Sequence, residues 1–128
     1  MKTQESMENY LETIYVLNQK TGFVRSVDVA LEMGFSKPSI SNAMKKLKAE
    51  GYVQIEDKGR IVLTEEGKAL AEGTYEKHCV ISHLLMDIGV SKETALADAC
   101  RMEHVLSAQT FEAIKRHITL GHELPDGV

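Results

Sequence analysis

The chain has 128 residues, 43% of them hydrophobic, with a formal net charge of −4 and two cysteines. This length fits one compact domain, or two small ones that share a core. No apolar run approaches the ~18 residues of a membrane-spanning helix, the start MKTQESMENY lacks the apolar centre of a secretory signal, and two cysteines make no disulfide framework. We therefore expect a protein of the reducing cytoplasm, with no membrane partner.

The first third of the chain reads as helices separated by glycine-containing breaks. Residues 4–20 are predicted to form a first helix, because apolar side chains recur there at three- and four-residue spacing. After KTGF, Ser26 is the expected N-cap of a short second helix with Ala30 and Leu31 among its apolar positions. Gly34 is its expected end.

The next segment completes a recognisable motif. Ser36 is predicted to cap a third helix, KPSISNAMKKLKAEG, which Gly51 ends. Two helices joined by a tight turn, the second rich in Ser, Asn and Lys, are typical of a helix-turn-helix. YVQIEDKGRIVLT then reads as strand, turn and strand. A hairpin directly after a recognition helix predicts a winged helix-turn-helix domain over residues 1–63.

The remainder, residues 64–128, is predicted to be an all-helical domain. Three helices are expected there: Thr64 to Gly89, about 92–106 with Ser91 as cap, and Ser107 or Thr110 to Gly121. The fold class is thus mainly α with a small β-hairpin wing. The second domain holds more apolar residues between Val80 and Ile114 than so small a unit needs for itself, which favours a homodimer formed through this half.

Charge is unevenly distributed along the chain. Residues 36–60 hold six basic residues against three acidic ones, and both flanking segments are acidic. Because the second helix of a helix-turn-helix enters the major groove, we expect double-stranded DNA as a partner, contacted by polar and basic residues of the third helix and the wing tip. These candidates are Lys37, Ser39, Ser41, Asn42, Lys45, Lys46, Lys58 and Arg60.

These candidates divide by the part of DNA that they can contact. Asn can read adenine and Lys can reach guanine acceptors, whereas the wing residues would position the protein on phosphates. The alternative is that the lysines form only a solvated helix face. Two-fold pairing of such modules would make the operator palindromic.

The stretch DACRMEHVLS in the second half carries three metal-ligand types. If it is helical, Cys100, Glu103 and His104 fall within about a 60° arc, one turn apart. Thiolate, carboxylate and imidazole on one stripe can form a transition-metal site. A buried cysteine beside a solvent-facing Glu–His pair is the alternative that these residues leave open.

SMENYLETIY, YEKH and ACRMEHVLS, in that order around a winged helix, resemble the diphtheria toxin repressor family of iron- and manganese-dependent repressors, which includes the shorter manganese transport regulators. The resemblance implies a repressor of iron or manganese uptake genes with the metal as corepressor, and no enzymatic activity. It also implies one or two divalent ions held by ligands from three helices: Glu12, His78, Cys100, Glu103 and His104. Asn9, one turn before Glu12, is a further candidate ligand.

This donor set suits Fe²⁺ or Mn²⁺, and in vitro Zn²⁺, Co²⁺ or Ni²⁺, rather than Mg²⁺ or Ca²⁺. Cys100 resembles the iron branch of the family, whereas the short chain resembles the manganese branch. Asn9 stands where the family usually has Met or Asp, and an amide is a weak neutral ligand. Ser82 and Leu96 stand where the toxin-repressor branch carries ligands of a second site.

Other readings of these residues remain. Cys79 and His83 lie a turn apart and could replace the second site, but we expect a buried cysteine beside a surface histidine. A winged-helix regulator that responds to a small organic ligand, or to oxidation of Cys100, would also fit. A small metallohydrolase is disfavoured, because no nucleophile–base pair or phosphate loop is evident.

Overall fold

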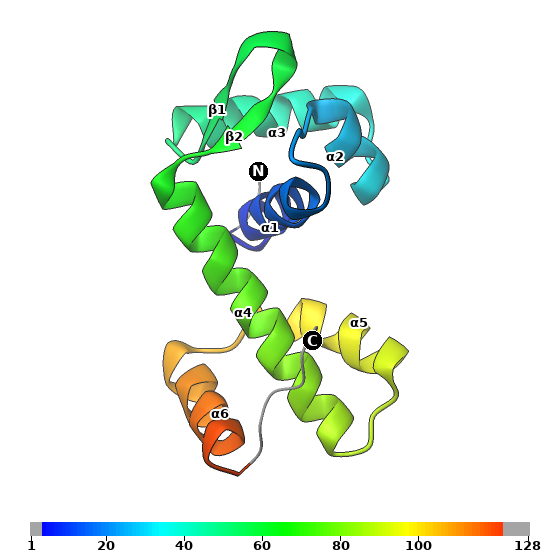
Figure 1. Cartoon of the computed structure of the whole chain (residues 1–128), viewed down its shortest axis with the longest axis vertical. Coiled ribbons are helices and arrows are strands. Elements are labelled where there is room, and N and C mark those ends of the chain that lie inside the picture. The colour runs from blue at the N-terminus through cyan, green and yellow to red at the C-terminus, as the bar shows by residue number, and fades with distance from the viewer. Residues whose placement is uncertain (1–3, 122–128) are drawn as a thin grey trace. The chain divides into compact units, whose positions relative to one another are not determined.

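The computed structural model describes residues 4–121, and contacts divide the chain into two units, Met1–Glu72 and Gly73–Val128. The boundary falls within the long helix α4, so each unit is considered by itself (Figure 1). No helix among the described residues is both long enough and apolar enough to cross a membrane.

The first unit is a winged helix-turn-helix, as predicted. Its elements are α1 (Gln4–Thr21), α2 (Ser26–Met33), α3 (Lys37–Ala49), β1 (Val53–Ile55), the 3-10 turn η1 (Asp57–Gly59), β2 (Ile61–Leu63) and the start of α4 (Glu65–Asp87). The two strands pair antiparallel, with Val53 opposite Leu63 and Ile55 opposite Ile61. The hairpin is therefore the predicted wing.

An aliphatic core holds this unit together. Its most buried members, each at most 2% exposed, are Leu11, Ile14, Val24, Val29, Ile40, Leu47, Val53 and Ile61. The short second helix is present as predicted, but its apolar residue Leu31 is 79% exposed. α2 packs through Val29 and Ala30 instead.

The helix ends follow local chemistry. Ser36 caps α3 as predicted, since its side chain accepts a hydrogen bond from the Ser39 amide, and Gly34 ends α2 with a left-handed φ of 70°. The prediction that Ser26 caps α2 was wrong. The N-cap is Arg25, whose backbone N–H donates to the Asp28 carboxylate at 2.9 Å. An acidic side chain three residues after the N-cap, here Asp28, can accept the hydrogen bond of the N-cap amide, so the N-cap residue itself needs no hydroxyl.

The second unit contains the rest of α4, α5 (Lys92–Met102) and α6 (Ala108–Gly121). Val80, Phe111 and Ile118 form its buried apolar cluster. Lys115 Nζ donates to Glu76 Oε1 at 3.1 Å and so links α6 to α4. This hydrogen bond raises the pKa of Lys115 above its ordinary value.

Two helix boundaries in the second unit refine the predictions. Ser107, not Thr110, caps α6, because its hydroxyl accepts the Thr110 amide at 3.1 Å. The helix predicted over about 92–106 ends at Met102. Beyond it, the amides of His104 and Val105 bond to carbonyls three residues earlier, and this tighter turn leaves Val105 74% exposed.

Candidate metal centre and DNA interface

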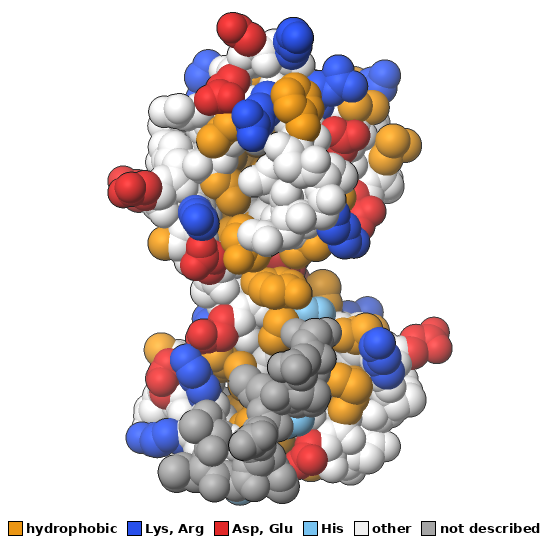
Figure 2. All heavy atoms as spheres, in the orientation of Figure 1, with side chains coloured by type: hydrophobic (Ala, Val, Ile, Leu, Met, Phe, Trp, Pro, Cys, Tyr) orange, Lys and Arg blue, Asp and Glu red, His pale blue; other side chains and the backbone are white. Residues whose placement is uncertain are grey.

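The third helix presents a polar face to solvent. All six residues predicted there to contact DNA are exposed: Lys37, Ser39, Ser41, Asn42, Lys45 and Lys46. Ile40, Met44 and Leu47 form its buried face. Figure 2 shows Lys and Arg side chains over the end of this unit that carries the wing and α3, with acidic side chains between them. The polar face of α3 is therefore available to a nucleic acid.

The two predicted wing residues differ in their surroundings. Lys58 is exposed at the hairpin turn, with a left-handed φ of 65°. Arg60 instead contacts the protein: its Nη2 donates to the Gly22 carbonyl at 3.1 Å, and its guanidinium lies 5.5 Å from the centre of the Phe23 ring. Its Nη1 is also 3.8 Å from Glu56 Oε1. Arg60 therefore fastens the wing to the loop after α1.

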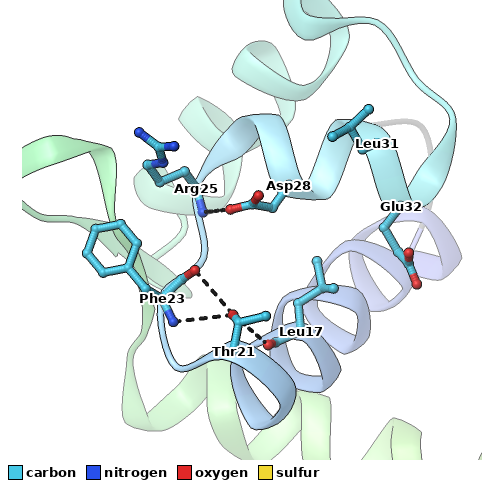
Figure 3. A pocket seen from close by; sticks show the side chains of 7 residues that line it. All are labelled: Leu17, Thr21, Phe23, Arg25, Asp28, Leu31 and Glu32. Atoms are coloured by element: carbon cyan, nitrogen blue, oxygen red, sulfur yellow. Dashed lines mark hydrogen bonds between the residues drawn. The ribbon is translucent and has the colours of Figure 1, made fainter.

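An open pocket of about 470 Å³ lies beside this loop, between the end of α1 and α2 (Figure 3). Its lining residues are Leu17, Thr21, Phe23, Arg25, Asp28, Leu31 and Glu32. The Thr21 hydroxyl donates to the Leu17 carbonyl at 3.1 Å and accepts the Phe23 amide at 3.3 Å, which shapes one wall. No residue predicted to bind DNA or metal lines the pocket.

Replacing Lys45 by alanine is expected to weaken DNA binding about equally for all sequences and to lower the salt slope by about 1, because one phosphate contact is lost. Metal affinity should not change. Fluorescence anisotropy with promoter DNA at several salt concentrations measures both quantities. Lys20→Ala, which removes an exposed lysine from the end of α1, is the matched control. Equal effects of the two substitutions would exclude a specific contact by Lys45.

In the second unit, a buried carboxylate lies between two imidazoles. The side chain of Glu103 is fully buried, with Oε2 3.2 Å from His78 Nδ1 and Oε1 3.3 Å from His104 Nε2. The side chain of His104 is only 1% exposed, and that of His78 is 23% exposed. Three residues predicted to be ligands, from α4 and from the turn after α5, are thus brought together.

The cysteines and the remaining histidine of α4 differ from expectation. Cys100 is exposed near the end of α5, so the alternative of a buried cysteine beside a solvent-facing Glu–His pair was wrong. The expectation for Cys79 and His83 is also reversed: Cys79 is half-buried, whereas His83 is 8% exposed. The period of α4 turns His83, rather than Cys79, toward the interior of the unit.

Asn9 and Glu12 lie one turn apart on α1, in the first unit, and both are half-buried. Ser82, at one position of the second site in the toxin-repressor branch, is fully buried and donates its hydroxyl to the His78 carbonyl at 2.7 Å. Its side chain therefore supports the backbone of α4.

The chemistry of the buried cluster fits a cation. Neither carboxylate oxygen of Glu103 accepts a hydrogen bond from the described part of the chain, and a buried carboxylate is costly without a hydrogen bond or a positive charge. Imidazole and carboxylate are ligands for divalent transition metals. No group of three or more His, Cys, Asp or Glu side chains among residues 4–121 is already arranged to hold an ion. In this structure each imidazole instead contacts one oxygen of Glu103.

Sequence reasoning missed one aromatic neighbour of this cluster. The ring of Tyr75 stacks on that of His78, with centroids 6.4 Å apart and an interplanar angle of 22°. Tyr75 precedes His78 by three residues on α4, a spacing that places two side chains on one helix face. This three-residue spacing is the sequence feature from which the contact between Tyr75 and His78 could have been predicted.

A winged helix-turn-helix with a polar recognition face, joined to a helical unit with a buried Glu–His cluster, defines a DNA-binding regulator with a candidate metal centre. Comparison with known families agrees with this class. Residues 2–61 match the iron dependent repressor N-terminal DNA-binding domain, and residues 64–127 match the metal binding and dimerisation domain of the same proteins. The chain belongs to the iron-dependent repressor family, whose members are transcriptional regulators and not enzymes.

The chain is also similar to individual transcriptional regulators of this kind. The transcriptional regulator MntR of Salmonella typhimurium is 36% identical over 110 residues, which cover 86% of this chain and 70% of MntR. The manganese regulator SloR is 28% identical, with a TM-score of 0.81, over 94% of this chain and 57% of SloR. ScaR with bound Zn²⁺ is 29% identical, with a TM-score of 0.79 and the same coverage. The chain therefore spans a little over half the length of these two solved proteins.

Proposed function

We propose that this chain represses iron or manganese uptake genes in the cytoplasm, with the metal ion as corepressor. In this proposal residues 1–63 bind a palindromic operator, and residues 64–128 bind metal and form a homodimer. The observation that carries the proposal is the Glu103 carboxylate, fully buried between His78 and His104. Family membership supplies the connection between such a site and DNA.

The proposed ligands belong to both halves of the chain. Asn9 and Glu12 come from α1 in the DNA-binding half, and the rest come from the dimerisation half: His78, Cys100, Glu103 and His104. Without an ion, closely spaced carboxylates and a potential thiolate would repel each other and leave α1 free to move. A divalent cation would cancel this charge and tie α1 to the dimerisation domain.

Such a tie would control DNA binding by fixing the separation of the two recognition helices. Thermodynamic linkage requires that metal and DNA raise each other's affinity by the same factor. A coupling of about 1–3 kcal/mol, roughly 5- to 150-fold, would suffice for a switch.

Homodimer formation is supported by apolar side chains that the single chain leaves exposed. Ile88 is 68% exposed and Val105 is 74% exposed, both in the second unit. Two copies would also double the short DNA contact of one winged helix, which explains why the expected operator is palindromic.

The identity of the ion is argued from the donors and from the relatives. SloR is described as a manganese regulator, which supports Mn²⁺. The thiol of Cys100 is a softer ligand than a carboxylate and favours Fe²⁺ over Mn²⁺. We therefore propose Fe²⁺ or Mn²⁺, and expect Zn²⁺, Co²⁺ or Ni²⁺ to bind in vitro.

A gel shift on the protein's own promoter tests this function. With a chelator, the operator complex is expected to be lost, and adding Mn²⁺ or Fe²⁺ back should restore it. The promoter with a scrambled operator is the control. A complex of unchanged affinity with chelator, or one restored by a thiol oxidant rather than metal, would overturn the proposal.

A further inference from the structure

His78 is contacted from two directions by side chains of its own unit. The ring of Tyr75 forms an offset stack with the imidazole, with ring centroids 6.4 Å apart and planes 22° from parallel. Oε2 of the Glu103 carboxylate lies 3.2 Å from Nδ1 of the same ring. Both contacts lie within Gly73–Val128.

These two contacts constrain the imidazole in different ways. An aromatic face restricts rotation of the imidazole about its Cβ–Cγ bond, because the ring leaves the stack when it turns. A carboxylate beside Nδ1 favours the one of the two remaining orientations that keeps this nitrogen near it. The hydrogen bond from Ser82 to the His78 carbonyl, 2.7 Å long, involves the helix backbone and not the imidazole ring.

We propose that Tyr75 is a positioning residue for the metal centre: its ring holds the His78 imidazole with Nδ1 beside Glu103, so that an ion meets an oriented ligand. This inference rests on the proposed function of His78. A ligand that is held before the ion arrives loses less conformational freedom on binding. Since a stacked pair stabilises its geometry beyond simple burial, losing the stack should lower metal affinity roughly two- to tenfold.

Tyr75 is suited to substitution because it is 37% exposed and lies outside the buried apolar cluster of its unit. Leucine in its place keeps much of the apolar volume and removes the ring. Phenylalanine keeps the ring and removes only the hydroxyl. Comparing the two variants therefore distinguishes the effect of ring stacking from the effects of apolar packing and of hydrogen bonding by the hydroxyl.

The test is a Co²⁺ titration of the full chain, followed by the visible absorption of the bound ion. Tyr75→Leu is expected to bind Co²⁺ two- to tenfold more weakly, with an altered spectrum because the imidazole is less ordered. Tyr75→Phe should retain the wild-type affinity and spectrum. In a His78→Ala background, Tyr75→Leu should have no further effect, as a double-mutant cycle requires of two coupled groups.

The outcomes separate this inference from the function on which it rests. If His78→Ala binds Co²⁺ like the wild type, the proposed metal centre is wrong. If His78→Ala loses affinity while Tyr75→Leu keeps both affinity and spectrum, only the positioning role is overturned. Equal losses in Tyr75→Leu and Tyr75→Phe, or additive losses in the double variant, would also overturn it.

Discussion

Replacing His104 by alanine is expected to abolish the response of DNA binding to metal while the protein stays folded. The His104 side chain is 1% exposed, and its Nε2 lies 3.3 Å from Glu103 Oε1. Without this imidazole, the proposed centre loses one of its buried nitrogen donors. The roughly 5- to 150-fold gain in operator affinity that we expect from metal should then disappear. Glu103→Ala should act in the same way, because it removes the carboxylate between the two imidazoles.

Operator affinity with and without Mn²⁺ or Fe²⁺, measured by fluorescence anisotropy, gives this response directly. Circular dichroism checks that the helices are retained. His117→Ala removes an exposed histidine from α6 and is the matched control, which should respond to metal like the wild type. If His104→Ala kept a normal metal response, the proposed switch would be wrong.

The second large effect is expected at Gly67, where α4 begins against the hairpin. A Cβ at this position would overlap the carbonyl oxygen of Tyr52 and lie 2.9 Å from the Tyr52 carbonyl carbon. The Tyr52 carbonyl cannot move easily, because it accepts the Thr64 amide at 3.0 Å. The Thr64 hydroxyl also donates to the Gly51 carbonyl at 2.7 Å and accepts the Gly67 amide at 3.1 Å. Gly67→Ala should therefore lower the free energy of unfolding by about 2–3 kcal/mol.

The same helix supplies the control for this prediction. Gly73 also lies in α4, and a Cβ there meets nothing within 4 Å. Gly73→Ala should be neutral or stabilise the protein by up to about 1 kcal/mol, since alanine favours helix. Urea unfolding of both variants measures the difference. A loss of less than about 0.5 kcal/mol in Gly67→Ala would contradict the close approach that we describe.

The sequence was sufficient to predict the order of the elements, because local signals agreed with the packing. Ser36 has the hydroxyl that a helix start requires. Gly34 has the backbone freedom that a helix end requires. The alternation of apolar and polar residues on both sides of the DKGR turn likewise predicted both strands of the hairpin.

The errors arose where one local signal competed with another. Ser26 looked like a cap, but the Asp28 carboxylate satisfies the Arg25 amide and starts α2 one residue earlier. Helical periodicity continued past Met102, whereas the backbone tightens there into a turn with bonds to carbonyls three residues earlier. A hydrophobic pattern does not reveal such a change in hydrogen bonding.

The buried Glu–His cluster was predictable in part. Cys100, Glu103 and His104 were grouped by helical spacing, and the structure adds that Glu103 is the buried member while Cys100 is exposed. The contact between Glu103 and His78 joins residues far apart in sequence, so it could be anticipated only from the family resemblance. Metal binding by all six candidate ligands remains a prediction: Asn9, Glu12, His78, Cys100, Glu103 and His104.

Anomalous diffraction from crystals of the full chain loaded with Mn²⁺ or Fe²⁺ tests the central claim most directly. We predict an anomalous peak bound by Glu103 and His104 from the second unit together with Glu12 from α1. A peak bound only by residues of the second unit, or no peak beside Glu103, would contradict a centre that joins the DNA-binding and dimerisation domains.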